Sequence, residues 1–273
     1  MAVLLTGCRK DRASENPRWD ECKQIYATVV HYSGENDSTE KYLEIAERSQ
    51  RLFQLLEEKA DAFVMNAYNY QALDEKGTPL YTMNTFSYPE EIAPNGRSIQ
   101  VSKNYFSFNP IETSDGSNMA DRILYDDMTL NILVPEAYRE MEEQIAEAYR
   151  ADFYFQKVTA TNDYYEMAGM KEHLDISEDS LNINIIYVKD GQQYFTYRSD
   201  CASQTDNQIT DPIVQIYTSN IHCNYAHSNM SQWVYFRSDK ETAEEAFEEI
   251  VPYIEECGAA DSFQKVKPVY GKN

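Results

Sequence analysis

The sequence is poor in glycine, tryptophan and basic residues. Only 9 of its 273 residues are glycine and 2 are tryptophan, and no glycine-rich phosphate-binding pattern occurs in it. Lysine and arginine number 24 against 46 aspartate and glutamate, which gives a formal net charge of −22 at pH 7. Such a surface repels nucleic-acid phosphates and anionic lipid headgroups, so nucleic acid is excluded as an expected partner.

Long hydrophobic runs are also missing. No apolar stretch approaches the roughly 18–20 residues that span a bilayer, so the chain as given is not expected to cross a membrane itself. Hydrophobic residues make up 42% and charged residues 26% of the sequence, a composition typical of a folded domain rather than a disordered tail. The length fits one large domain or two small ones.

Histidine is scarce, and the common catalytic motifs are absent. The sequence contains no G-x-S-x-G nucleophile elbow and no P-loop. The segment His222 to His227 (HCNYAH), which includes Cys223, is the one ligand-like cluster, but a zinc site normally needs a second ligand pair. We therefore predict no catalytic residues, no metal and no cofactor. A surface hydrolase with a Ser-His-Asp triad scattered along the chain stays an alternative.

The cysteine count is odd, and the first cysteine has a distinctive context. Leu5, Thr6, Gly7 and Cys8 match the lipobox of bacterial lipoproteins, which predicts lipidation of Cys8. Only seven residues precede Cys8 and none of them is basic, whereas a signal peptide has a basic region and roughly 7–15 apolar residues. A truncated start, the end of a membrane helix or a chance match are the alternatives.

The other four cysteines allow three pairings. An external compartment would permit disulfides, and we expect Cys201 to pair with Cys223. Cys22 would then pair with Cys257. Buried or unpaired thiols are the alternative.

Hydrophobic periodicity predicts an α+β fold, a mixed sheet with about three main helices packed on one face. Residues 1–24 are expected to be a leader or tether and residues 25–270 a domain, with a division into subdomains 25–128 and 129–270 as the alternative. Strand-helix-strand units are predicted around 25–73, 129–158 and 233–270. Lys189 to Gln192 (KDGQ) predicts a hairpin turn between 181–188 and 193–197. Further strands are expected at 99–108 and 153–158, and Pro252 should kink or break the last helix.

Several segments resemble a known family when taken in order. They are residues 98–105 (SIQVSKNY) with Asn109-Pro110-Ile111, residues 130–136 (LNILVPE) with Tyr138, residues 183–189 (INIIYVK), residues 193–197 (QYFTY), and Asp211-Pro212-Ile213. The series resembles the external domain of bacteriocin-associated integral membrane proteins, which are permease-like proteins related to the FtsX and macrolide-exporter type of ABC transporter permease. The resemblance covers roughly residues 40–270.

The resemblance implies a role and no chemistry. It implies a non-enzymatic extracytoplasmic domain of an ABC-type export or peptide-resistance system, which docks a membrane permease or a peptide and transmits motion. Its anchor would be the lipid on Cys8 or membrane helices outside this chain. An acidic surface would attract a cationic peptide, with association weakened by salt. The alternative is a freestanding surface lipoprotein that binds a small ligand or acts as an immunity factor. An aromatic-lined pocket would favour this alternative, and a flat, tyrosine-rich patch would favour docking.

Overall fold

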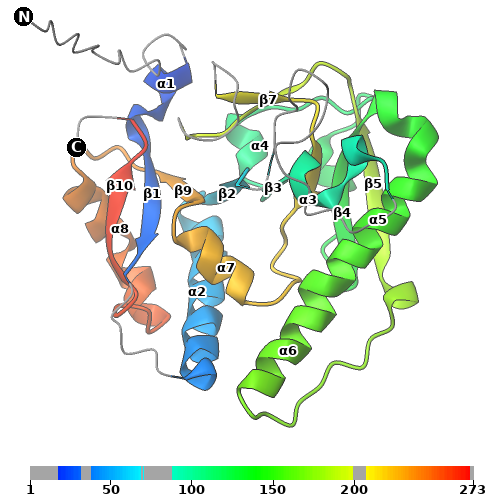
Figure 1. Ribbon diagram of the computed structural model, residues 1–273. Helices are drawn as coiled ribbons and strands as arrows, with labels where there is room; N and C mark the ends of the chain where they lie inside the picture. The colour runs from blue at the N-terminus through cyan, green and yellow to red at the C-terminus, as the bar shows by residue number, and fades with distance from the viewer. Residues whose placement is uncertain (1–17, 32–37, 69, 71–87, 199–206, 271–273) are drawn as a thin grey trace, which may run out of the picture.

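The protein has an α+β fold built on one mixed sheet, as predicted (Figure 1). The computed structural model describes residues 18–31, 38–68, 70, 88–198 and 207–270. The strands of the main sheet are β1 (Ile25–Val30), β2 (Phe63–Asn66), β3 (Ser98–Val101), β4 (Thr129–Pro135), β5 (Asn182–Val188), β8 (Ile213–Ile216), β9 (Val234–Arg237) and β10 (Phe263–Pro268). Their order is β10-β1-β9-β2-β3-β8-β4-β5.

In one half of the sheet, strands from the N-terminal part of the sequence pair with strands from the C-terminal part. Strand β1, helix α2 (Thr39–Lys59) and β2 form one unit, and β9, helix α8 (Ala243–Glu256) and β10 form the other. Strand β9 pairs antiparallel with both β1 and β2, and β1 pairs antiparallel with β10. Each unit therefore receives a strand of the other between its own two strands, which is the split βαβ arrangement of ferredoxin-like folds.

The other half of the sheet comes from the part of the sequence between β2 and β9. Strand β4 pairs in parallel with β5 and antiparallel with β8, and β8 pairs in parallel with β3. The parallel connection from β4 to β5 contains α5 (Glu142–Tyr154), a π-helical turn (Phe155–Thr159) and α6 (Ala160–Met167). A second, two-stranded sheet of β6 (Gln193–Phe195) and β7 (Gln208–Thr210) lies between β5 and β8 in the sequence.

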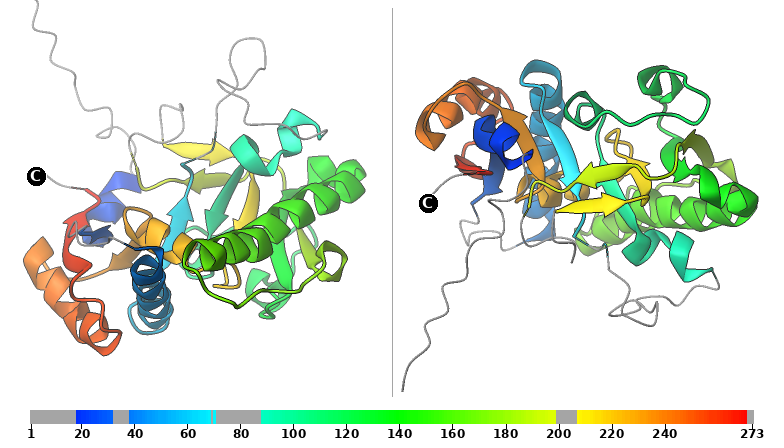
Figure 2. Two further views of the ribbon diagram at one scale, coloured as in Figure 1. Left: turned by 60° about the horizontal axis from the view of Figure 1, so that its bottom comes forward. Right: turned by 90° about the horizontal axis from the view of Figure 1, so that it is seen from above.

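The main sheet has a core on each face. One face is covered by α2, α5, α8 and α7 (Asn224–Met230), whose buried residues pack on Ile132 and Val134. The opposite face is covered by α1 (Arg18–Glu21), α4 (Tyr105–Phe108) and the β6–β7 sheet, which pack on Leu133 and Val214 and form the second core. The two further views show these layers (Figure 2). Successive strand residues point to opposite faces, so one strand serves both cores.

Local signals account for the two long helices. The Ser38 hydroxyl accepts a hydrogen bond from the Lys41 amide at the start of α2, and the Thr242 hydroxyl accepts one from the Glu245 amide before α8. Such capping satisfies N–H groups that have no partner within the helix. Helix α8 continues through Pro252 to Glu256, so this proline does not break the helix, and the predicted kink stays a prediction.

Five short turns complete the described secondary structure around the sheet. They are 3₁₀ turns at Cys22–Gln24, Glu90–Ile92, Met119–Arg122, Glu136–Met141 and Glu178–Ser180, with the short helix α3 (Pro94–Arg97) before β3. The predicted strand at 99–108 is thus only half right, because α4 begins at Tyr105. The sequence also predicts a strand at residues 80–86, and these lie outside the described residues.

The segment 153–158 is helical rather than extended. Its residues continue α5 through the π turn, and Gln156, Lys157 and Val158 are consecutive and all buried. Phe153 and Val158 face the core, whereas Phe155 is 54% exposed. The apolar and aromatic run that looked like a strand is therefore divided between the sheet-facing and the solvent-facing sides of a helix. The predicted strand-helix-strand unit closes with β5 instead.

The expected tether ends earlier than predicted. Residues 18–24 form α1 and a 3₁₀ turn, and Trp19 and Cys22 are buried in the second core. Their apolar side chains are separated by three positions, which places them on one side of a helical turn. Residues 1–17 lie outside the described residues, so the folded domain includes residues 18–24 as well as 25–270.

The strand pairing does not support the alternative division into subdomains 25–128 and 129–270. Strand β1 lies between β9 and β10, and β3 pairs with β8. Each half of the sheet therefore contains strands from both sides of that boundary, and the two segments cannot form separate sheets.

The predicted hairpin around residues 189–192 is a turn, but not between paired strands. Gly191 has a φ of +80°, the left-handed conformation that favours glycine. The Asp211 carboxylate accepts hydrogen bonds of 2.9 Å from the amides of Gly191 and Gln192. Strand β6 therefore turns away from β5 and pairs with β7, because the turn is held by the segment that precedes β8.

Candidate functional site

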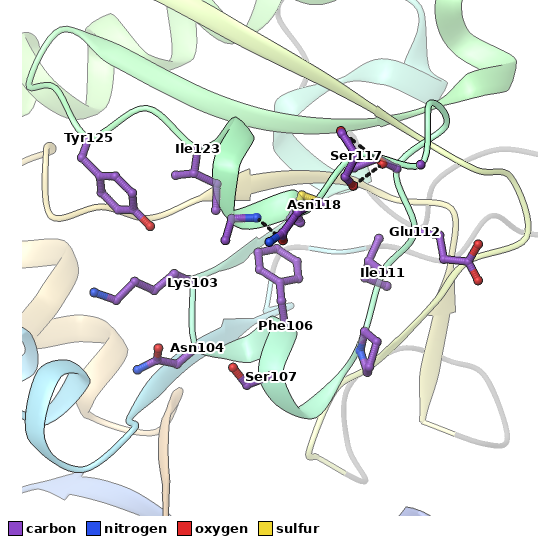
Figure 3. A pocket seen from close by; sticks show the side chains of 15 residues that line it. Lys103, Asn104, Phe106, Ser107, Ile111, Glu112, Ser117, Asn118, Ile123 and Tyr125 are labelled. Atoms are coloured by element: carbon purple, nitrogen blue, oxygen red, sulfur yellow. Dashed lines mark hydrogen bonds between the residues drawn. The ribbon is translucent and has the colours of Figure 1, made fainter.

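A pocket of about 560 Å³ lies beside the segment from Lys103 to Tyr125 (Figure 3). We call it the Phe106 pocket. Its apolar surface comes from Phe106, Ile111, Met119 and Ile123, which pack against the second core. The volume falls within the roughly 300–1,000 Å³ that is typical of small-ligand sites.

Two asparagines hold the near wall of the pocket in place. The Asn104 side-chain amide donates to the carbonyl oxygens of Glu57, at 2.7 Å, and Ala62, at 3.1 Å. Asn109 donates to the Tyr197 hydroxyl at 2.8 Å and accepts from Arg18 at 2.6 Å. These bonds hold both ends of α4, which carries Phe106. The start of α4 is bound to the end of α2 and the segment after it, and its end is bound to α1 and to the segment after β6.

The far wall is a tight loop stabilised by its own polar side chains. Thr113 donates to the Ser117 carbonyl at 2.7 Å, and Asp115 accepts from the Ser117 amide at 2.9 Å and pairs with Arg122 at 2.7 Å. Hydrogen bonds from Ser117 and the Arg122 charge hold the pKa of Asp115 well below its ordinary value. The Asn118 side chain accepts from the Ala120 amide at 3.1 Å and caps the 3₁₀ turn. The Asp115 carboxylate therefore stabilises this loop and has a structural role.

Charged groups stand at the two ends of the pocket (Figure 3). At one end the Lys103 ammonium lies 3.5 Å from the Glu57 carboxylate and 6.0 Å from the centre of the Tyr125 ring. Burial raises the pKa of Glu57, and hydrogen bonds from Ser102 and the charge of Lys103 act in the opposite direction. At the other end Glu112 pairs with Lys189. Tyr125 is 63% exposed, so a ligand can reach its ring.

The cysteines do not pair as predicted where the structure describes them. Cys22 and Cys257 are free thiols, and they belong to cores on opposite faces of the main sheet. A disulfide requires Cα atoms within about 7 Å, and the sheet stands between them. Cys223 is also a free thiol, whereas Cys201, its predicted partner, and Cys8 lie outside the described residues. Burial raises the pKa of Cys22 to about 12 and that of Cys223 to about 11, so both are protonated at neutral pH.

The histidine cluster is divided between two structural contacts. His222 stacks on Tyr164 with ring centres 4.5 Å apart, whereas the Nδ1 atom of His227 lies 2.8 Å from the Ser49 hydroxyl. No group of three His, Cys, Asp or Glu side chains that could hold a metal ion occurs within the described ranges.

The Ser49 and His227 pair is not arranged for nucleophilic catalysis. The Ser49 hydroxyl donates to the Ile45 carbonyl at 2.9 Å, so it accepts a hydrogen bond from the imidazole rather than giving up its proton to it. Ser49 is also fully buried on the sheet-facing side of α2, where no substrate can reach it.

Seven of the 22 tyrosines are buried in the two cores and have structural roles. The buried tyrosines are Tyr26, Tyr105, Tyr149, Tyr194, Tyr197, Tyr217 and Tyr235. The large hydrophobic side chains that remain exposed include Tyr68, Leu124 and Tyr125, and Tyr125 lines the Phe106 pocket.

The fold and the pocket define a class: an α+β domain with a ligand-sized, partly apolar pocket. Comparison with protein-family models, with curated proteins and with solved structures gave no match. No helix in the described part of the chain is both long and apolar enough to span a bilayer.

Proposed function

We propose that this chain is a non-enzymatic extracytoplasmic binding domain that holds the apolar side chains of a peptide in the Phe106 pocket. The observation that supports this proposal is the pocket itself, with its apolar floor and exposed Tyr125. A net charge of −22 favours a cationic peptide by long-range attraction. The sequence resemblance supplies the setting, an ABC-type export or peptide-resistance system with a membrane permease as partner.

A freestanding surface lipoprotein that binds a small ligand or acts as an immunity factor is the second candidate. The pocket volume favours it, because about 560 Å³ suits a single small molecule. In both cases the same wall residues make the contacts, and the two candidates differ in the anchor and in the length of the natural gene product.

Truncating Tyr125 tests the pocket. The probe is a short fluorescent peptide of alternating arginine and leucine with an acetylated N-terminus, and binding is measured by fluorescence anisotropy. We expect Tyr125→Ala to weaken binding on the order of tenfold, because an exposed aromatic ring at a pocket rim is a frequent anchor in interfaces.

Tyr68→Ala is the matched control, since Tyr68 is 69% exposed and does not line the pocket. Its affinity should equal that of the unaltered protein. Equal losses in both variants, or none in Tyr125→Ala, would refute the assignment to this pocket. Repeating the titration at high ionic strength should lower the association rate, and a salt-independent rate would contradict attraction by the acidic surface.

The intact mass of the natural gene product, purified from membranes, tests the setting. A chain that begins at Cys8 and carries a diacylglyceryl group is expected for a freestanding lipoprotein. A much longer polypeptide is expected for a permease whose external domain is this chain. An unmodified chain found only in the soluble fraction would contradict both forms of anchoring.

A further inference from the structure

A row of amide side chains crosses the helix-covered face of the main sheet. Asn66 of β2 is paired with Gln100 of β3, and Gln100 is paired with Gln215 of β8. Paired residues of neighbouring strands point to the same face, so the three amides lie side by side. Most of the other residues on this face are apolar, such as Val64, Ile132 and Ile213. Polar groups in such a place require partners. Asn229 of α7 accepts a hydrogen bond from Asn66 at 2.8 Å and donates one to Gln100 at 3.0 Å, and Gln215 donates to Asp152.

The amides line a small cavity under α5 and α7. Its volume is about 90 Å³, and Asp152, Gln156 and Tyr225 complete its wall. Asn66, Gln100, Asp152 and Tyr225 are each partly exposed, so the cavity communicates with solvent. It lies on the opposite face of the sheet from the Phe106 pocket. It is thus a second site, separate from the one proposed above.

Asp152 is held in this cavity by two amides. The side-chain amide nitrogen of Gln156 lies 2.6 Å from Oδ2 of Asp152, and that of Gln215 lies 3.1 Å from the same oxygen. Among the described residues, no hydrogen bond reaches Oδ1 and no cationic side chain forms an ion pair with this carboxylate. Burial raises the pKa of Asp152 to about 6, against the effect of the two amide donors. At neutral pH a mostly ionised carboxylate therefore stands here without a counter-charge.

The acceptor groups of the cavity define what it can bind. The free oxygen of Asp152, the side-chain oxygen of Gln215 and the Tyr225 hydroxyl can all accept hydrogen bonds. A primary ammonium has three N–H donors and one positive charge, which matches this set. A divalent metal ion would require more carboxylates and more oxygen ligands than the cavity offers.

We propose that the Asp152 cavity binds a primary ammonium group. The carboxylate supplies the counter-charge, and Gln215 and Tyr225 supply neutral acceptors. The group is carried either by a lysine-type side chain or by the free N-terminus of a peptide or amino acid. The site does not depend on the peptide proposal for the Phe106 pocket, and the arginine-leucine probe used there contains no primary ammonium.

The test is a titration of the folded chain with butylammonium, which mimics a lysine side chain, and with glycinamide, which mimics an N-terminus. The carboxyl carbon of Asp152 is followed by ¹³C NMR. We expect saturable binding of at least one probe and a lower pKa of Asp152 when it is bound, because the ammonium favours the ionised carboxylate. The probe that binds more tightly identifies the source of the group.

Two variants and two other cations decide the outcome. Asp152→Asn should weaken binding at least tenfold, and Tyr225→Phe should weaken it several-fold. Asp163→Asn on α6 is the control, since it removes one exposed acidic charge away from the cavity and should leave the affinity unchanged. Equal competition by tetramethylammonium or potassium, which lack N–H donors, would overturn the proposal, as would equal losses in Asp152→Asn and Asp163→Asn. A Phe106 pocket that fails its own test leaves this result unaffected.

Discussion

Replacing Trp19 by alanine is expected to lower the free energy of unfolding by about 3–5 kcal/mol, the usual loss for a large aromatic residue in a core. Trp19 is only 3% exposed. Its ring meets the Phe195 ring edge-on with centres 5.1 Å apart and stacks on Tyr270 at 6.2 Å. The substitution therefore leaves a cavity between α1, the β6–β7 sheet and the segment after β10.

The same helix is also tied to the Phe106 pocket. Next to Trp19, Arg18 donates to the Phe108 carbonyl at 3.2 Å and to the Asn109 side chain at 2.6 Å. Residues at the start of the chain thus support the wall that carries Phe106. Loss of Trp19 should weaken peptide binding in proportion to the loss of folded protein.

Urea denaturation followed by circular dichroism measures the effect of the Trp19 substitution. Asp20→Ala is the matched control on the same helix, because Asp20 is exposed and its one ion pair, with Lys23 at 2.8 Å, is a surface pair. Such a pair contributes about 0–1 kcal/mol. A change of less than about 1 kcal/mol for Trp19→Ala would mean that residues 18–24 are the tether that the polar sequence predicted.

Replacing Asp152 by asparagine is expected to stabilise the protein near pH 8 and to have little effect near pH 4. Burial raises the folded-state pKa of Asp152 from 3.8 to about 6, so the folded state binds the proton more tightly than the unfolded state does. Stability contributed by the protonated carboxyl is full below about pH 4 and is lost as the pH rises through about 6. Asparagine has no such loss.

The expected gain near pH 8 is about 1–3 kcal/mol. The upper figure is the shift of about two pKa units converted at about 1.4 kcal/mol per unit. Asparagine can keep both hydrogen bonds, because Gln156 and Gln215 donate to the same oxygen, Oδ2. Its amide carbonyl can occupy that position and accept from both.

Neighbouring titratable groups should not disturb the comparison. The hydroxyls of Tyr149 and Tyr225 face Asp152 from α5 and α7, and burial raises both of their pKa values, so they stay neutral. Burial lowers the pKa values of His222 and His227 on the α7 side, and both are present in the two proteins.

Thermal or urea unfolding of the unaltered protein and of Asp152→Asn across pH 4 to pH 8 checks this expectation. A difference that grows with pH and levels off above about pH 6 supports it. A variant that is less stable than the unaltered protein near pH 8 would show that the carboxylate stabilises the fold and has an unrecognised counter-charge. A residue that lowers stability in this way is typical of functional sites.

Much of the scaffold was predictable from sequence because its signals are local. Leu43, Ala46, Phe53 and Leu56 recur at helical spacing and are buried in α2. The apolar run in β4 and the periodic face of α8 behave in the same way. Each of these elements buries a face that its own residues define, so no distant residue was needed to recognise it.

The candidate sites had weaker signals. The resemblance included Lys103, Asn104 and Asn109, yet Phe106 became part of a pocket only when the loop from Ile111 to Tyr125 folded over it. Asp152 and Gln156 continue the sheet-facing helical stripe of Ile145 and Tyr149, and such a polar interruption is a signal that could have indicated the cavity. Its other wall, Gln215, is 63 residues further along the chain.

The sequence by itself determined the acidic charge, the α+β class and the main helices, because composition and short-range periodicity are sufficient for these. Tertiary structure decided that residues 18–24 belong to the core, that Cys22 and Cys257 stay apart, and that 153–158 is helical. It also decided which polar side chains meet at Asp152. These outcomes depend on which face of the sheet each residue occupies, and that is set by strand pairing between segments far apart in the chain.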